Sequence, residues 1–159
     1  MNSIEKVTPK TFVKTISIIH FALLGSIIMF GVFVYFQNNN WILNIENTED
    51  IFLMVVPLAI LAGVLMGSII YRKKVNSLKD RQSLKEKLTG FQEALILKYA
   101  LIEGPAFLSI VAAMLTGNSL YLIISGVLVL YMLSLKPTQR KIEQGLELSR
   151  AMRDELSGK

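Results

Sequence analysis

The stretch 51-IFLMVVPLAILAGVLMGSIIY-71 decides the fold class, because it is 21 residues long and contains no charged side chain. A helix rises about 1.5 Å per residue and needs about 20 apolar residues to cross the roughly 30 Å hydrocarbon core of a bilayer. The stretch therefore predicts a membrane-spanning helix. The whole chain of 159 residues points the same way, since 52% of it is hydrophobic and its mean hydropathy is +0.49.

Three further apolar windows predict three more crossings. Residues 15–36 carry no fixed charge and exceed the apolar region of a secretory signal, so we expect a retained membrane helix there. Residues 94–116 include two charged side chains, Lys98 and Glu103, and residues 120–135 number only 16 and need their flanks to reach across. The sequence predicts an all-α integral membrane four-helix bundle of two antiparallel hairpins, with helices at about 11–36, 50–72, 91–116 and 119–136.

The windows divide the chain into a four-span transmembrane domain over 1–136 and a cytoplasmic amphipathic tail over 137–159. The transmembrane domain includes a basic cytoplasmic connector over 72–90. Apolar residues recur in this connector at helical spacing among charges, which predicts a basic amphipathic helix on the membrane or on a partner. Thr89 followed by Gln92 has the pattern of a capping box, where the third spanning helix can begin.

The tail begins with a stop signal and a start signal for helices. Pro137 ends the fourth spanning helix, and Thr138 can cap a new one. The segment that follows places Ile142, Leu146 and Leu156 broadly on one face among charges. We expect one further amphipathic helix, docked on this protein, on lipid or on a partner.

Charge at the ends of the windows predicts the orientation, because Lys and Arg favour the cytoplasmic side. The segment up to Lys14 has three Lys and one acid, residues 72–88 have seven Lys and Arg against two acids, and the tail from Lys136 has six against four. The loop over 37–50 has three acids and no base. We therefore expect a multi-pass protein of a bacterial inner (plasma) membrane with both termini in the cytoplasm.

The basic residues have a membrane explanation. The net charge is +5, and the excess lies within a few residues of helix ends, where anionic lipid headgroups attract it. Arg72, Lys73 and Lys74 are the candidates for headgroup contact. The expected partners are the lipid bilayer and a second copy or another membrane protein, and nucleic acid is not expected.

Small residues and prolines predict where helices approach and bend. Small residues at four-residue spacing let two membrane helices come close, and the candidates are Ala59, Gly63, Gly67, Gly25 and Gly104. Pro57 and Pro105 lack an N–H, so each should kink its helix and free the carbonyl four residues earlier. For Pro105 that carbonyl belongs to Leu101, close to Glu103.

Glu103 is the main candidate for a polar intramembrane site, because a carboxylate facing lipid costs several kcal/mol. Three roles remain open: a protonated or hydrogen-bonded packing residue, a proton or cation site beside the freed carbonyl, or a contact for the polar part of a ligand or partner helix. His20 can approach it from the neighbouring helix, and Tyr99 lies one turn before it on the same face.

Composition excludes several kinds of chemistry. The chain has no cysteine and one histidine, so disulfides and thiolate metal sites are excluded, a conventional transition-metal site is not expected, and no cofactor is implied. No histidine cluster, Ser-Lys pair or acidic metal motif occurs within a spanning window, and we therefore expect no enzymatic activity and no catalytic residue.

The segment 91-FQEALILKYALIEG-104 resembles the carboxylate-bearing helix of rotary ATP synthase proteolipids, which also place one acid in an apolar hairpin. Proteolipid hairpins turn in the cytoplasm through an arginine-containing loop, whereas here the short TGNS turn faces outward, so the resemblance bears on Glu103 alone. The whole chain resembles small four-span bacterial inner-membrane proteins with an apolar EGPA segment in the third helix. That resemblance implies a membrane fold and no particular activity.

The function expected from the sequence is that of a non-enzymatic small integral subunit or scaffold. Its basic cytoplasmic helices would contact partners or anionic lipid. The alternative is a proton- or cation-handling membrane protein that works through Glu103.

Overall fold

The computed structural model describes residues 9–47 and 49–157, and most of these are helical. The described part contains no strand, only one isolated bridge between Ile42 and Asn118. The six described helices are α1 (Pro9–Gln37), α2 (Phe52–Leu78), α3 (Leu84–Thr116), α4 (Leu120–Ser134), α5 (Gln139–Gly145) and α6 (Arg150–Ser157).

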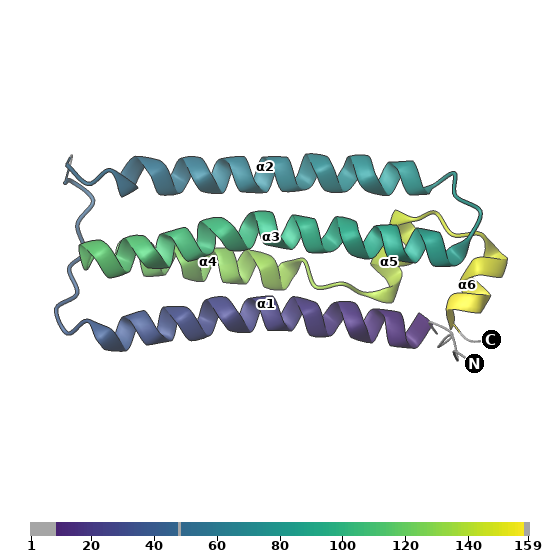
Figure 1. Cartoon of the computed structure of the whole chain (residues 1–159), viewed down its shortest axis with the longest axis horizontal. Helices are drawn as coiled ribbons and strands as arrows, with labels where there is room; N and C mark the ends of the chain where they lie inside the picture. Colours follow the sequence, from purple (N-terminus) through teal and green to yellow (C-terminus); the bar gives the residue numbers. More distant parts are fainter. Residues whose placement is uncertain (1–8, 48, 158–159) are drawn as a thin grey trace, which may run out of the picture.

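The third helix occupies the centre of the arrangement. It packs against α1, α2 and α4, and α1 also contacts α4 and α6. Figure 1 shows α1, α2 and α3 as three long rods side by side, with α4 behind them. The helices α5 and α6 lie at the end of the molecule where both termini are found (Figure 1). The central position of α3 explains why polar side chains on it can meet residues from three other helices.

Three helices are long and apolar enough to cross a membrane, and a fourth crossing depends on a bent pair. The three segments are Thr11–Gln37, Phe52–Leu78 and Leu84–Thr116. Helix α4 has 15 residues and is about 22 Å long, which is short of a roughly 30 Å hydrocarbon core. It is followed after a short break by α5, at an angle of 74°. The described part of the chain thus has three candidate spans, or four if α4 and α5 form one broken span.

The outside of the long helices is apolar. Met29 and Phe36 on α1 are 75% and 77% exposed, and Leu130 on α4 is 67% exposed. Soluble monomers rarely expose large contiguous apolar surfaces, because water disfavours them. Such an exterior suits contact with lipid chains, as expected for membrane helices.

The connector between the second and third spans is shorter than expected. Helix α2 continues to Leu78 and α3 begins at Leu84, so the expected amphipathic helix over 72–90 is absent, and Thr89 lies inside α3. The physical reason is that Leu84, Leu88 and Phe91 continue the buried face of α3 toward its N-terminus. Packing along this face outweighs the capping pattern at Thr89.

The tail folds back on the ends of the helices near both termini (Figure 1), as two pieces instead of one. Thr138 caps α5 as expected, since its side chain accepts a hydrogen bond from Lys141 N. The chain then breaks around Glu147, whose φ of 48° is incompatible with a continuous helix. The apolar residues of the tail are buried in the core, as expected for a docked amphipathic segment. Ile142 and Leu146 are 0% exposed, and Leu156 is 2% exposed.

Helix α2 reaches α3 through glycines. A Cβ on Gly63 would lie 2.2 Å from the carbonyl oxygen of Leu101 and 3.0 Å from Cγ of Pro105. The carbonyl that Pro105 frees therefore faces a Cα–H of Gly63 on α2, a weak donor that a side chain would displace. Gly67 is also buried against α3, where its Cβ position lies 3.5 Å from Cβ of Leu101.

The other candidates for packing and bending lie in different surroundings. The Cβ positions of Gly25 and Gly104 have no neighbouring atom within 4 Å, so these glycines border open space in the described part of the chain. Ala59 on α2 is half-buried. Pro57 and Pro105 lie inside continuous helices, α2 and α3.

Candidate functional site

The early end of α4 creates a polar centre inside the apolar helices. The last carbonyl groups of a helix have no partner within it and must find other donors. The hydroxyl of Tyr99 on α3 donates to the carbonyl oxygen of Leu135 at 3.0 Å. The ammonium of Lys141 on α5 donates to the carbonyl oxygens of Ser134 and Lys136, both at 3.1 Å. These donors satisfy carbonyl groups that the end of α4 leaves without partners in the helix.

His20 on α1 belongs to this centre. Its ring lies 4.8 Å from the ring of Tyr99, centroid to centroid, and its side chain is fully buried. Neither ring nitrogen has a hydrogen-bond partner among the described residues. His20 therefore packs as a ring beside Tyr99, and its two buried nitrogens are unsatisfied.

Glu103 on α3 pairs with Ser26, a residue far from it in the sequence. Oγ of Ser26 on α1 lies 2.9 Å from Oε1 of Glu103 and 2.6 Å from the carbonyl oxygen of Leu23. A hydroxyl has one proton and a backbone carbonyl only accepts. The single proton of Ser26 is therefore shared between two acceptors, Oε1 of Glu103 and the carbonyl oxygen of Leu23. The pair connects α1 with α3.

The three candidate residues His20, Tyr99 and Glu103 do not form one site. Together with Ser26 they form two neighbouring pairs. Tyr99 lies with His20 and the end of α4, and Glu103 lies one helical turn further along α3 with Ser26. Ser26 and Glu103 are 77 residues apart in sequence, and no local pattern connects them. Leu135 supplies the carbonyl group that accepts from Tyr99, and Lys141 donates to the carbonyl groups beside it. The sequence contains one indication of these roles, because the fourth apolar window is short and is soon followed by Pro137.

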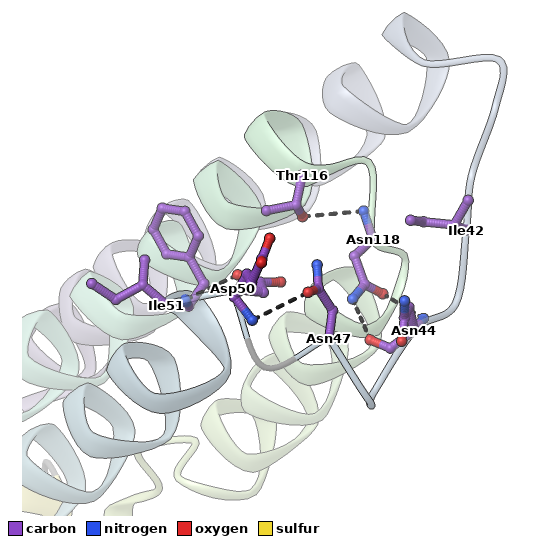
Figure 2. A pocket seen from close by; sticks show the side chains of 9 residues that line it. Ile42, Asn44, Asn47, Asp50, Ile51, Thr116 and Asn118 are labelled. Carbon is purple, nitrogen blue, oxygen red and sulfur yellow. Dashed lines mark hydrogen bonds between the residues drawn. The ribbon is translucent and has the colours of Figure 1, made fainter.

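A second polar region lies at the end of the molecule away from both termini (Figure 2). The loop after α1 adds a short extended pairing to the turn between α3 and α4, with Ile42 N donating to the Gly117 carbonyl oxygen at 3.0 Å and Ser119 N donating to the Ile42 carbonyl oxygen at 2.8 Å. Nδ2 of Asn118 donates to the Asn44 carbonyl oxygen at 2.6 Å. The turn itself requires Gly117, whose φ is 67°.

A cavity of about 400 Å³ lies beneath this loop, lined by Asn47, Glu49, Asp50 and Thr116 among others. Both Asp50 oxygens already accept hydrogen bonds, from Phe52 N at 3.0 Å and from the Tyr121 hydroxyl at 2.6 Å. Figure 2 shows the loop's polar groups turned toward one another. They hold the loop onto the helix ends, so we assign this region to structure.

The candidate headgroup residues lie near the C-terminal end of α2. Arg72 and Lys73 are exposed, and Lys74 forms an ion pair with Glu93 of α3 at 3.7 Å.

The described residues include no group of three or more acidic or histidine side chains that could hold a metal ion. The chain matches no protein-family model, no curated protein and no solved structure.

The hydrogen bond at the end of α4 can be tested with Tyr99→Phe. The substitution keeps the ring but leaves the Leu135 carbonyl without its donor, which should lower the free energy of unfolding by about 1–3 kcal/mol. Thermal unfolding in detergent would measure the change. Tyr35→Phe is the matched control, since Tyr35 is 55% exposed. Equal stability of the two variants would show that the Tyr99 hydroxyl does not hold the end of α4.

Proposed function

We propose that this protein is a non-enzymatic integral membrane protein of a bacterial plasma membrane, with four spans and both termini in the cytoplasm. Its basic inner end contacts the anionic headgroups of the cytoplasmic leaflet. The fourth span in this proposal is the bent pair of α4 and α5, and the four spans form a bundle around α3.

The segregation of charge to the two ends of the helices carries this proposal. The end formed by the loop over 38–51 and the turn at 117–119 has the acids Glu46, Glu49 and Asp50, and neither segment contains Lys or Arg. The opposite end holds the inner half of α2, the start of α3, and α5 and α6 (Figure 1). Basic residues concentrate there, in the pattern that keeps an end in the cytoplasm.

The contacts of Glu103 favour a structural role over ion handling. Its Oε1 has Ser26 as a partner, so the carboxyl group connects α1 to α3. The carbonyl of Leu101, which a cation beside Glu103 would need as a ligand, faces Gly63 of α2. The proposed function therefore does not use Glu103 as a transport site, and a polar bond between helices accounts for its place in the membrane.

The absence of cysteine from the chain allows a direct test of orientation. We expect the single variant Ile45→Cys to react with a membrane-impermeant maleimide on intact cells, because Ile45 is 69% exposed in the acidic loop. Asp80→Cys and Arg150→Cys, both at exposed positions of the basic end, should react only after the membrane is opened. Labelling of position 80 from outside would overturn the proposed function. The cysteine-free parent is the control for background labelling.

A further inference from the structure

A second cavity lies at the basic end, where α2 and α3 face the break between α4 and α5. Its volume is about 270 Å³. It exists because α4 stops at Ser134 and α5 turns away at 74°, which leaves space beside the inner halves of α2 and α3. The cavity is smaller than typical pockets for drug-sized ligands, at about 300–1,000 Å³. It can hold a small polar group.

The charged groups that line this cavity are both positive. Lys98 of α3 and Lys141 of α5 contribute to its wall, and the described residues that line it include no acid. The charges that act most strongly on Lys98 are Arg72 and Lys141, which are also positive. The ion pairs between described side chains join Lys74 to Glu93, Lys79 to Glu147, and Arg81 to Glu86. Among the described side chains, no carboxylate forms an ion pair with either cavity lysine.

The two ammonium groups retain donors for a ligand. An ammonium group has three N–H donors. Lys141 uses two of them for the carbonyl oxygens of Ser134 and Lys136, so one remains. Lys98 has its ammonium 4.9 Å from the centre of the Tyr71 ring, a cation–π contact that holds the lysine in place without neutralising its charge. Two like charges beside one cavity repel each other, and an anion between them would reverse that repulsion.

The remaining walls favour an amphiphile over a soluble anion. Tyr71, Leu95, Tyr99 and Pro137 line the cavity together with Gln144, so most of its surface is aromatic or apolar. Tyr71 follows the apolar stretch of α2, at the depth where tyrosine rings meet lipid headgroups. A phospholipid can place its phosphate at the lysines and keep its acyl chains in the bilayer beside the helices. A soluble anion would gain nothing from these apolar walls.

We propose that this cavity is a binding site for the phosphate of an anionic phospholipid, with Lys98 and Lys141 as its two charged donors. The site rests on the proposed function, because the cavity opens to the cytoplasmic leaflet only if the basic end faces the cytoplasm. It goes beyond general attraction between a basic surface and the membrane, since it holds one lipid per chain. Gln144 supplies a further polar group at the cavity wall.

The test is retention of phosphatidylglycerol by the purified full-length chain, measured by native mass spectrometry and by titration in phosphatidylcholine nanodiscs. We expect one retained phosphatidylglycerol per chain. The double variant Lys98→Gln Lys141→Gln should weaken it roughly 10- to 30-fold, from about a factor of five per lysine near an anionic surface. Lys14→Gln Lys85→Gln removes the same charge from exposed positions that the cavity does not include, and should leave the single site intact.

Several outcomes would overturn the site. Equal weakening by both double variants would show general surface attraction, and equal retention of phosphatidylcholine would show that the phosphate's net charge is not recognised. Displacement of the lipid by millimolar inorganic phosphate would assign the cavity to a soluble anion. The variant Lys98→Arg Lys141→Arg keeps the charge and should keep the lipid. Loss of binding in that variant, with an unchanged helical spectrum and melting curve, would contradict the charge-based site.

Failure of this site and failure of the proposed function give different results. Lipid retention in detergent does not depend on orientation in the cell. If the cysteine variants label as expected but no lipid binds saturably, the cavity site is wrong and the proposed function stands. If positions 80 and 150 label from outside and one lipid is still retained, the proposed function is wrong, and the lipid site faces the other leaflet.

Discussion

Gly63→Ala is expected to lower the free energy of unfolding by about 3 kcal/mol or more, the upper end of the usual range for overpacking. The added Cβ would lie 2.2 Å from the carbonyl oxygen of Leu101, a backbone atom that cannot rotate away. It would also lie 3.0 Å from Cγ of Pro105, whose ring is fixed to the backbone. The helices α2 and α3 would have to separate along their length. Thermal unfolding in detergent, followed by circular dichroism, would measure the loss.

Gly104→Ala provides the matched control, with the same substitution inside a spanning helix. Apart from its chain neighbours and the backbone of its own helix, no atom lies within 4 Å of its Cβ position, so alanine adds no clash. Because glycine is a poor residue for a helix interior, this variant should be neutral or more stable by up to about 1 kcal/mol. If Gly63→Ala and Gly104→Ala unfold at the same temperature, α2 and α3 do not approach each other at Gly63.

Leu146→Asp is expected to detach the tail from the basic end of the helices. Leu146 is fully buried, and the neighbouring Gly145 packs so closely that its Cβ position lies 3.3 Å from Cε2 of Phe91. An unpaired carboxylate in such a site costs several kcal/mol, more than the tail can regain elsewhere. Trypsin should then cleave after Arg140 roughly 100-fold faster, since about 3 kcal/mol of lost docking raises the open population by that factor. Timed digestion with mass spectrometry would measure the rate.

Ala151→Asp is the control for this experiment. It introduces the same side chain into the same tail, at a position that is exposed on α6. We expect its cleavage rate to match that of the unmodified chain. Similar rates for Leu146→Asp and Ala151→Asp would contradict docking of α5 on the helices.

The features that the sequence predicted well depend on short segments. A run of uncharged residues is enough to predict a spanning helix, as for the stretch that became the apolar part of α2. Pro137 and Thr138 were enough to predict a stop and a new start, and α5 begins at Gln139. These predictions hold because the bilayer thickness, the missing proline N–H and the capping hydroxyl each act within a few residues.

The sequence could not predict which helix faces meet. In a soluble protein the buried face of a helix is apolar and the outer face polar, so the pattern indicates the rotation of the helix. In a membrane both faces are apolar, because lipid chains are as apolar as leucine. Leu61 on α2 is 57% exposed and Ile102 on α3 is 1% exposed, yet their chemistry is nearly the same. The pairing of Ser26 with Glu103 depended on such a rotation.

By itself, the sequence determined that this chain has apolar helices long enough for a membrane, an acidic loop, and basic ends, because hydrophobicity and charge are local properties. Only the tertiary structure decided that Gly63 meets the carbonyl freed by Pro105, that Ser26 meets Glu103, and that Lys98 and Lys141 share one cavity. Each of these contacts joins different helices, and in a bilayer the rotation and depth that bring two helices together are set by close packing that no single helix records.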